Sequence, residues 1–321
     1  MQLLRFPVPA DCSGMRLYVF LRTMGVSATC IKTVKYHGKG FFASGEPIHT
    51  DQKVQQGQQI TFELPPEPPT DVQAQQVPFR VAYEDEFAAV LDKPAGIAVH
   101  PTLNHPDGTL ANGWIYLLAQ RGQTGVFRPV NRIDKNTSGL VLCAQNAFAA
   151  PLLSATVRKC YLALVEGSLP LGPGRIDAPI ARRGDSIIGR CVREDGKPSV
   201  TAYTVLAASP THSLAACFPL TGRTHQIRVH FSWQGHPLAG DTLYGGHEGL
   251  MTRHALHCAV LRFRVPISGE ERRVQSPLPP DFSAACVAAG LPAGAQIGDL
   301  LQTVLPVGAD PAQDNPLRSR L

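Results

Sequence analysis

The stretch RPVNRIDKNTSGLVLCAQN, residues 128–146, joins a short polar turn to a dense apolar run. The apolar run, Leu140 to Cys143, predicts a buried strand. The turn before it carries Arg132 and Asp134, and a core tolerates such charges when they are paired. The stretch therefore indicates a functional site at the start of a core strand. The commoner alternative is that Asp134 caps a helix or closes an Asx turn.

The composition describes an ordinary globular protein. The 321 residues are 44% hydrophobic and 17% charged, with a formal net charge of +5 at pH 7. No apolar run approaches the roughly 20 residues that span a bilayer, and the N-terminus lacks the apolar segment of a secretory signal. Eight cysteines without a C-x-x-C pair favour reduced thiols over disulfides or a zinc site. We expect a cytoplasmic monomer, and local basic patches permit a nucleic-acid partner.

Residues 1–64 form a small basic unit by their pattern. They hold seven Lys and Arg against four Asp and Glu, a net charge of +3. Helical spacing predicts one helix within 14–25 and a second that carries Lys32 and Lys35. A hairpin and a final strand are predicted within 40–64. The proline-rich residues 65–78 then predict an extended linker.

The main body is expected to span residues 79–275. Short strands recur there with helical patches between them, which predicts an α+β domain with a mixed, largely antiparallel sheet and flanking helices. The sequence contains no G-x-G-x-x-G or G-x-x-x-x-G-K-[ST] motif, which argues against a nucleotide cofactor. Residues 276–321 are rich in Ala, Pro and Gly and predict a C-terminal extension that is partly disordered.

Polar residues gather beside apolar strands in three stretches, 131–134, 158–161 and 221–246. In the last, HQIRVHFSWQG predicts a helix on which His225 and Arg228, three residues apart, share one face. Each stretch also has an ordinary structural explanation, such as a solvated arginine on an amphipathic helix or a tyrosine in a core. Taken together, a carboxylate, a phenol and a guanidinium suit one small polar site.

A metal site is not expected. His225 and His230 are five residues apart, which turns them to different sides of a helix, and no third ligand accompanies them. His254 and His257 form a second pair without a further ligand in the pattern.

The stretch NRIDKNTSGLVLCAQN resembles the catalytic motif of the RluA/RluD-type RNA pseudouridine synthases, H-R-L-D-x-x-T-S-G followed by an apolar strand. KCYLALVEG, TGRTHQIRVHFSWQGHPLAGDTLYGG and RHALHCAVLRF are similar to further motifs of this family, in the same order. The resemblance covers about 80–275, and 14–64 resembles the small α-L RNA-binding domain of many members. Three positions depart from the pattern: Asn131 and Val265 each replace a His, and Ile133 replaces a Leu.

The resemblance implies isomerisation of uridine to pseudouridine in structured RNA, without a metal or other cofactor. Asp134 would act as nucleophile or as base, which the sequence leaves open. Arg228 is implied as the cation that holds Asp134 ionised, with Arg223 as the alternative. Tyr161 would stack on the uracil ring and could relay a proton, and Leu256 would pack on the other face of the ring.

A uracil inside stacked RNA must be flipped out before it can react. Arg132 lies two residues before Asp134, and alternation along an extended segment places both side chains on one side. Its planar cation can fill the vacated position and contact phosphate. Arg223 and His225 are further candidates for contacts with the RNA.

Structured RNA is the expected partner, with ribosomal RNA first and transfer RNA second. A non-catalytic RNA-binding or ribosome-assembly protein on the same fold is the alternative function. The presence of Asp134, Tyr161 and Arg228 together favours the enzyme. A carboxylate glycosidase is a third possibility, but it requires a second acid about 5–10 Å away, and Asp241 has no supporting pattern for that role.

Overall fold

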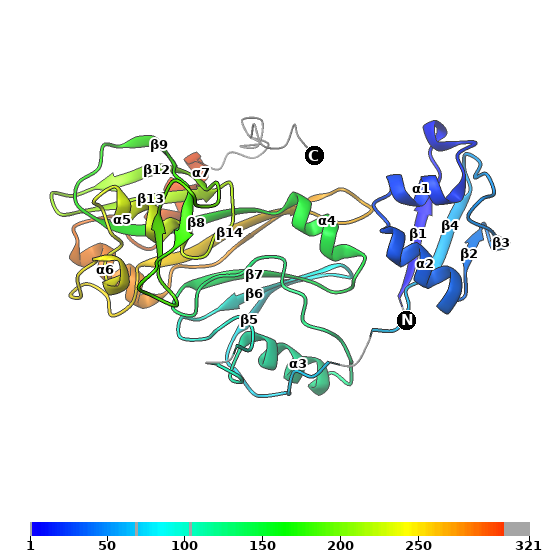
Figure 1. The fold of residues 1–321 in the computed structure, drawn as a ribbon, viewed down its shortest axis with the longest axis horizontal. Coiled ribbons are helices and arrows are strands. Elements are labelled where there is room, and N and C mark those ends of the chain that lie inside the picture. The colour runs from blue at the N-terminus through cyan, green and yellow to red at the C-terminus, as the bar shows by residue number, and fades with distance from the viewer. Residues whose placement is uncertain (1, 68–69, 103–104, 305–321) are drawn as a thin grey trace.

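The structure, a computed structural model, describes residues 2–67, 70–102 and 105–304. It contains a small N-terminal unit and a larger unit built on one extended sheet (Figure 1). The elements of the small unit are β1 (Leu3–Pro7), the 3-10 turn η1 (Ala10–Cys12), α1 (Leu17–Thr23), α2 (Ala28–His37), β2 (Phe41–Ala43), β3 (Glu46–Ile48) and β4 (Gln59–Glu63). Its described strands form an antiparallel four-stranded sheet in the order β1-β4-β2-β3.

The helices, hairpin and last strand of the small unit confirm the sequence-based predictions. Ser27 caps α2 by accepting a hydrogen bond from the Cys30 amide at 3.0 Å. Gly25, with φ of 83°, follows α1 and takes the left-handed conformation that commonly ends a helix. Strand β1 was not predicted, because five residues ending in proline give a weak strand signal. Its alternating burial and its pairing with β4 define it.

The small unit packs against α4 (Ala149–Thr156) of the large unit. The ring of Phe6 lies 5.8 Å from that of Phe148, at an interplanar angle of 85°. The Asn146 side chain donates to Gln2 Oε1 at 2.6 Å. These contacts join residues 2–7 to the segment that begins α4, and Figure 1 shows the small unit on the α4 side of the large unit.

The linker runs along α3 (Leu110–Gln120) of the large unit. The described residues of 65–78 hold no helix or strand. The Asn112 side chain donates to the Gln73 carbonyl at 2.9 Å, and the Gly108 amide donates to Gln75 Oε1 at 2.7 Å. These contacts attach the extended segment to the surface of the large unit.

The large unit is a nine-stranded mixed sheet within the described residues. Its strands are β5 (Arg80–Glu84), β6 (Ala88–Lys93), β7 (Ser138–Ala144), β8 (Arg158–Glu166), β9 (Gly172–Asp177), β12 (Val200–Ala208), β13 (His212–Pro219), β14 (Leu256–Arg264) and β15 (Glu271–Gln275). The order is β5-β6-β7-β14-β8-β13-β12-β9, and β15 pairs with β14. The pairing of β7 with β14 is parallel and the others are antiparallel. The predicted α+β class with a mixed, largely antiparallel sheet is confirmed.

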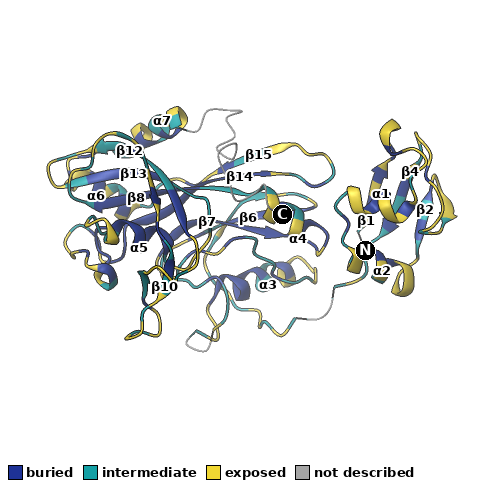
Figure 2. Ribbon diagram, turned by 45° about the horizontal axis from the view of Figure 1, so that its top comes forward, coloured by how far each residue is buried: buried dark blue, intermediate teal, exposed yellow. Residues whose placement is uncertain are grey.

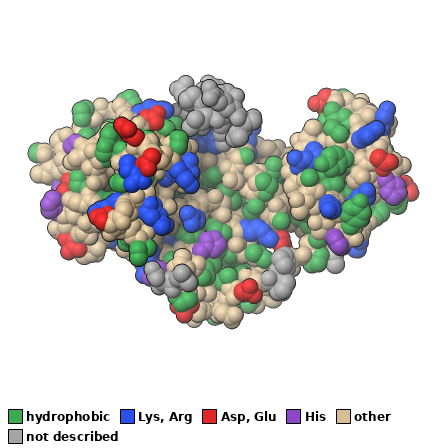
Figure 3. Space-filling model, viewed as in Figure 1, with side chains coloured by type: hydrophobic (Ala, Val, Ile, Leu, Met, Phe, Trp, Pro, Cys, Tyr) green, Lys and Arg blue, Asp and Glu red, His purple; other side chains and the backbone are tan. Residues whose placement is uncertain are grey.

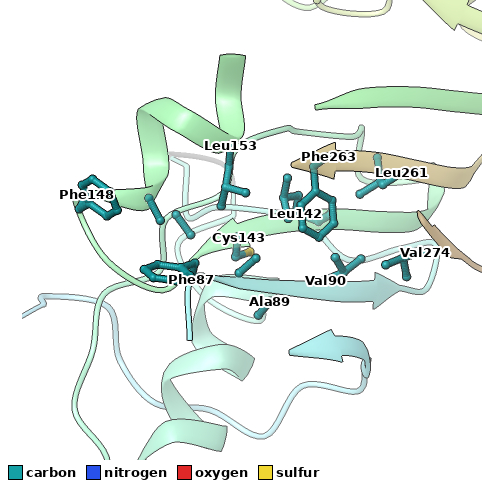
Figure 4. Packing of buried hydrophobic residues seen from close by; sticks show 14 of the residues in the cluster. Phe87, Ala89, Val90, Leu142, Cys143, Phe148, Leu153, Leu261, Phe263 and Val274 are labelled. Carbon is teal, nitrogen blue, oxygen red and sulfur yellow. The ribbon is translucent and has the colours of Figure 1, made fainter. Parts of the chain in front are cut away.

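Smaller elements surround this sheet. A short hairpin comprises β10 (Ile180–Arg182) and β11 (Arg190–Val192), and α5 (Gln226–Trp233) and the 3-10 turn η2 (Thr242–Tyr244) follow β13. Helix α4 covers the sheet from one side, and Leu153 points from it toward the strands that carry Leu142 and Phe263 (Figure 4). The central strands are buried and the outer surfaces of the small unit are exposed (Figure 2).

The described residues beyond 276, which end at 304, form two further helices, α6 (Pro280–Ala288) and α7 (Ala295–Val304). Phe282, Cys286, Ile297 and Leu301 are buried in a core cluster that includes residues of β8 and β14. The Ala-, Pro- and Gly-rich composition gave no sign of these helices. Residues 280–304 are therefore packed on the sheet. The expected disorder of the end of the chain concerns residues that lie outside those the structure describes.

None of the helices in the described part of the chain combines the length and apolar character that a membrane span requires.

Candidate active site

The sheet brings three separate segments to one place. Strands β7 and β14 are parallel, with His257 beside Ser138, so the turn before β7 and the start of β14 meet at the same edge. Strand β8 runs antiparallel to β14 and places Tyr161 beside Cys258. The polar turn that carries Asp134 therefore lies near Tyr161 and near the first residue of β14.

A pocket of about 620 Å³ opens at this edge, a volume typical of small-ligand sites. All seven residues singled out from the sequence line it: Arg132, Asp134, Tyr161, Arg223, His225, Arg228 and Leu256. The structure thus brings together the candidate catalytic set and the candidate RNA-contacting set, while their individual roles remain predictions.

Helix α5 is held in place by buried polar contacts. The Gln226 side chain donates to the Val200 carbonyl at 2.9 Å. His230 uses Nδ1 with Thr201 Oγ1 at 2.9 Å and Nε2 with the Ala178 carbonyl at 3.0 Å. Both ring nitrogens of His230 are therefore engaged by protein groups, away from His225. These contacts fix the helix that presents Arg228, and the sequence gave no reason to expect them.

Arg228 joins two carboxylates from different segments. Its Nη1 donates to Asp134 Oδ2 at 3.0 Å, and its Nε and Nη2 each donate to one oxygen of Asp241 at 2.7 Å. The side chain of Asp241 is 1% exposed and that of Arg228 is 7% exposed, whereas that of Asp134 is 25% exposed. Asp241 therefore orients the guanidinium, and Asp134 keeps a face open to the pocket. The alternative cation, Arg223, donates instead to the Pro198 carbonyl.

Asp134 is ionised at neutral pH. Burial raises its pKa, but the nearby His225, Arg228 and His254, together with the hydrogen bond from Arg228, outweigh burial and lower the pKa below its ordinary value. Burial also lowers the pKa of His225, and lowers that of His254 to about 3, so both rings are mainly neutral. Arg228 is thus the permanent cation among these three groups and the main reason that Asp134 keeps its charge.

His225 occupies a constrained position between Asp134 and Tyr244. It precedes α5 with φ of 59°, a conformation uncommon outside glycine. Its Nδ1 lies 2.7 Å from the Tyr244 hydroxyl, which also accepts a hydrogen bond from the Arg190 amide at 3.0 Å. If the hydroxyl donates to Nδ1, the proton of the neutral ring is on Nε2, which lies 3.8 Å from Asp134 Oδ2. His225 then presents a donor toward the carboxylate.

Tyr161 and Asn131 complete the walls near Asp134. Burial and the neighbouring Cys258 raise the pKa of Tyr161 well above its ordinary value, so its hydroxyl keeps its proton at neutral pH. Asn131 accepts a hydrogen bond from the Leu142 amide at 2.7 Å and donates to the Leu140 carbonyl at 3.2 Å. Asn131, one of the three residues that depart from the family pattern, thus holds the polar turn against β7.

Sequence reasoning assigned no role to three residues of the site. Asp241 and Tyr244 both lie in the motif-rich stretch 221–246, but their partners are not adjacent in the chain. Tyr244 contacts Arg228 through its ring, 5.0 Å from the guanidinium. The third residue is Lys93, at the end of β6, for which the sequence gave no signal.

Lys93 is fully buried beneath the polar turn. Its Nζ donates to the carbonyls of Pro94 at 2.9 Å and Lys135 at 3.0 Å. Burial lowers the pKa of Lys93 to about 7, and the charge of Arg253 adds to that effect, while Asp134 opposes it. The amine therefore ties the residue after Asp134 to the end of β6.

We expect Lys93→Met to change how stability depends on pH. The folded-state pKa of about 7 lies below the ordinary lysine value of about 10.4. The unfolded chain therefore binds more protons between these values, and the wild type gains stability relative to the variant as pH rises from 7 toward 10. Urea unfolding at pH 7 and pH 9.5 measures this. A difference in unfolding free energy that stays constant between the two pH values contradicts the burial of a titrating amine.

Basic side chains surround the mouth of the pocket. Arg132, Lys135 and Arg223 are exposed, and Lys159 is half-buried. Lys and Arg side chains gather on the lobe at the left of Figure 3. Such a rim attracts a polyanion toward the carboxylate inside.

Known proteins resemble this chain over most of its length. The family profile described as RNA pseudouridylate synthase matches residues 88–233. The uncharacterized RNA pseudouridine synthase YjbO of Bacillus subtilis is 37% identical over 266 residues, which cover 81% of this chain and 94% of the relative. Ribosomal large subunit pseudouridine synthase D of Xanthomonas campestris is 38% identical, over 74% of this chain and 77% of the relative.

A solved structure has the same fold. Human RNA pseudouridylate synthase domain containing 1 superposes with a TM-score of 0.53 and 29% identity, over 68% of this chain and 90% of the human one. The sequence motifs, the mixed sheet and these relatives agree with one another. The chain therefore belongs to the RluA/RluD-type RNA pseudouridine synthases, the isomerases that convert uridine to pseudouridine in RNA.

Proposed function

We propose that Asp134 is the group that acts on the target uridine and that the RNA is ribosomal. The observation that carries the proposal is the carboxylate of Asp134, held ionised by Arg228 and still 25% exposed to the pocket. An anionic oxygen that faces a cavity of small-ligand size can act as a nucleophile or as a base. Asp241 is bonded to Arg228 through both oxygens, which leaves no proton donor there for glycoside hydrolysis.

The reaction requires no external reactant. The bond between ribose C1′ and uracil N1 breaks, the ring turns, and a bond forms between C1′ and uracil C5. The hydrogen of C5 leaves to solvent and N1 gains a proton, so the product is an isomer of the substrate. In this scheme Asp134 attacks the nucleotide or removes a proton from it. The raised pKa of Tyr161 keeps its hydroxyl protonated, so the hydroxyl can donate a hydrogen bond to the nucleotide.

Tyr161 and Leu256 are the proposed contacts of the uracil ring. Both are buried and both line the pocket, one on β8 and one at the start of β14. An aromatic ring and an aliphatic side chain can enclose a flat base from its two faces. Asp134 lies in the turn that precedes β7, beside both.

Arg132 is the proposed wedge that replaces the flipped base. We expect Arg132→Ala to lower kcat/KM for structured RNA by about 10- to 100-fold, because flipping costs a few kcal/mol in a stacked context. The loss should be smaller for a short unstructured RNA that carries the same uridine. Steady-state assays on both RNAs measure the difference. Arg121→Ala is the control, since Arg121 pairs with Glu84 and does not line the pocket. Equal losses on the two RNAs contradict the wedge.

Ribosomal RNA is the proposed substrate, and transfer RNA is the second candidate. Support comes from the relatives named large subunit pseudouridine synthases D. The small basic unit, with α2 and its exposed Lys32 and Lys35, suits a second contact with structured RNA. We further propose that the protein acts as a monomer in the cytoplasm, where its eight free thiols would stay reduced.

The substrate can be identified by mapping pseudouridines in RNA from cells that lack the gene. Carbodiimide modification and primer extension would be compared between these cells, cells with a plasmid copy, and cells with the Asp134→Asn copy. Sites in ribosomal RNA that vanish, return with the wild type and stay absent with the variant are the expected result. Sites in transfer RNA would replace ribosomal RNA as the substrate. If no site changes in any culture, the non-catalytic RNA-binding alternative is the better account.

A further inference from the structure

The C-terminal helix α6 reaches the active-site turn through one buried arginine. Arg253, 9% exposed, lies shortly before β14, and its Nε and Nη2 donate to the two oxygens of Asp281 at 2.7 and 3.0 Å. Asp281 lies in the first turn of α6 and also accepts from the Phe282 amide at 2.8 Å. A planar guanidinium held by two parallel hydrogen bonds has a defined orientation.

The remaining donor of Arg253 points away from α6 and toward the site. Its Nη1 donates to the Asn136 carbonyl at 3.1 Å and lies 3.4 Å from the carbonyl of Leu256. Asn136 lies two residues after Asp134, within the turn that the Thr137 amide closes onto the Asp134 carbonyl at 3.0 Å. One guanidinium therefore contacts both the turn that carries the carboxylate and the residue proposed to pack on the uracil.

His254, the residue after Arg253, adds a second contact to the turn that carries Asp134. His254 Nε2 lies 2.8 Å from Thr137 Oγ1, in the same turn. Helix α6 itself is firmly seated, since Phe282 and Cys286 are fully buried against residues of β8 and β14. The carboxylate of Asp281 is thus a fixed point from which the arginine can position the turn.

We propose that Arg253 and Asp281 are positioning residues for catalysis, and that α6 is part of the active-site support. Asp281 orients Arg253, and Arg253 holds the backbone at Asn136 and Leu256. The distance between Asp134 and the uracil then depends on a carboxylate that lies outside the matched family region of 88–233. Because a shift of about 1 Å at a reacting group can cost about 100-fold in rate, loss of this pair should act on the chemical step.

The chain offers a matched control pair. Arg262 and Glu271 form a second arginine–carboxylate pair, between β14 and β15. The side chains of Arg253 and Asp281 are 9% and 51% exposed, and those of Arg262 and Glu271 are 10% and 47% exposed. Removal of either carboxylate should therefore lower stability by a similar amount, while Arg262 and Glu271 do not line the pocket.

The test compares Asp281→Ala with Glu271→Ala in the full-length protein. Ribosomal RNA transcribed with uridine tritiated at C5 is the probe, because each turnover releases tritium to water. We expect Asp281→Ala to lower kcat by about 10- to 100-fold with little change in KM, and Glu271→Ala to keep the wild-type kcat. Thermal unfolding should shift by a similar amount in both. Asp281→Asn keeps an acceptor for Arg253 and should give an intermediate kcat.

Equal kcat values for the two alanine variants, or a rise in KM with kcat unchanged, would overturn the positioning role. If Asp281→Ala does not fold, the kcat of Asp281→Asn decides, and a wild-type value overturns the proposal. The inference rests on the proposed function, which fails separately if the wild type releases no tritium or if Asp134→Asn remains fully active.

Discussion

We expect Asp134→Asn to lower kcat for pseudouridine formation by about 10⁴-fold or more, because the variant loses the anionic oxygen that would attack the nucleotide or remove its proton. The asparagine side chain has nearly the same shape and can still accept the hydrogen bond from Arg228. Affinity for RNA should therefore change little. Tritium release from C5-labelled RNA measures the rate, and filter binding measures the affinity.

The fold should survive this substitution, because Arg228 keeps both hydrogen bonds to Asp241. Thermal unfolding of the variant checks that expectation. Asp195→Asn is a suitable control, since Asp195 pairs with Arg193 in an exposed segment. An Asp134→Asn protein that binds RNA and keeps more than about a tenth of the wild-type rate would contradict the assignment of Asp134 as the reactive group.

Arg228→Met should lose both activity and stability. It leaves the carboxylate of Asp241, 1% exposed, without its partner, and an uncompensated buried charge costs about 3–5 kcal/mol in unfolding free energy. It also removes the permanent cation that keeps the pKa of Asp134 low. Chemical denaturation measures the stability and tritium release measures the rate.

A double variant separates the two effects. In Arg228→Met with Asp241→Asn the buried charge is gone, so much of the lost stability should return. Activity should not return, since Asp134 still lacks its cation. The activity and stability of Arg228→Lys should lie between those of the wild type and Arg228→Met. An ammonium keeps the charge but cannot form the bidentate contact with Asp241. A double variant that regains full activity would mean that Arg228 serves the fold rather than the reaction.

The class of fold could be predicted from the amino-acid sequence. Apolar runs such as Leu140 to Cys143 and the helical spacing around Arg228 are properties of a few consecutive residues, and they predicted strands and helices that the structure contains. The same local motifs named the residues that line the pocket. Strand β1 and helix α6 were not predicted, because short or Ala-rich segments show little periodicity of apolar and polar residues.

The sequence by itself determined the α+β class, the polar turn at Asp134 and the set of candidate residues. Only the tertiary structure decided that Arg228 is shared between Asp134 and Asp241, and that Arg253 joins Asp281 to the turn. The reason is physical: whether two charges pair depends on the register of β7, β14 and β8 and on where α6 packs. Those are contacts between residues far apart in the chain, and a pattern of neighbouring residues cannot predict them.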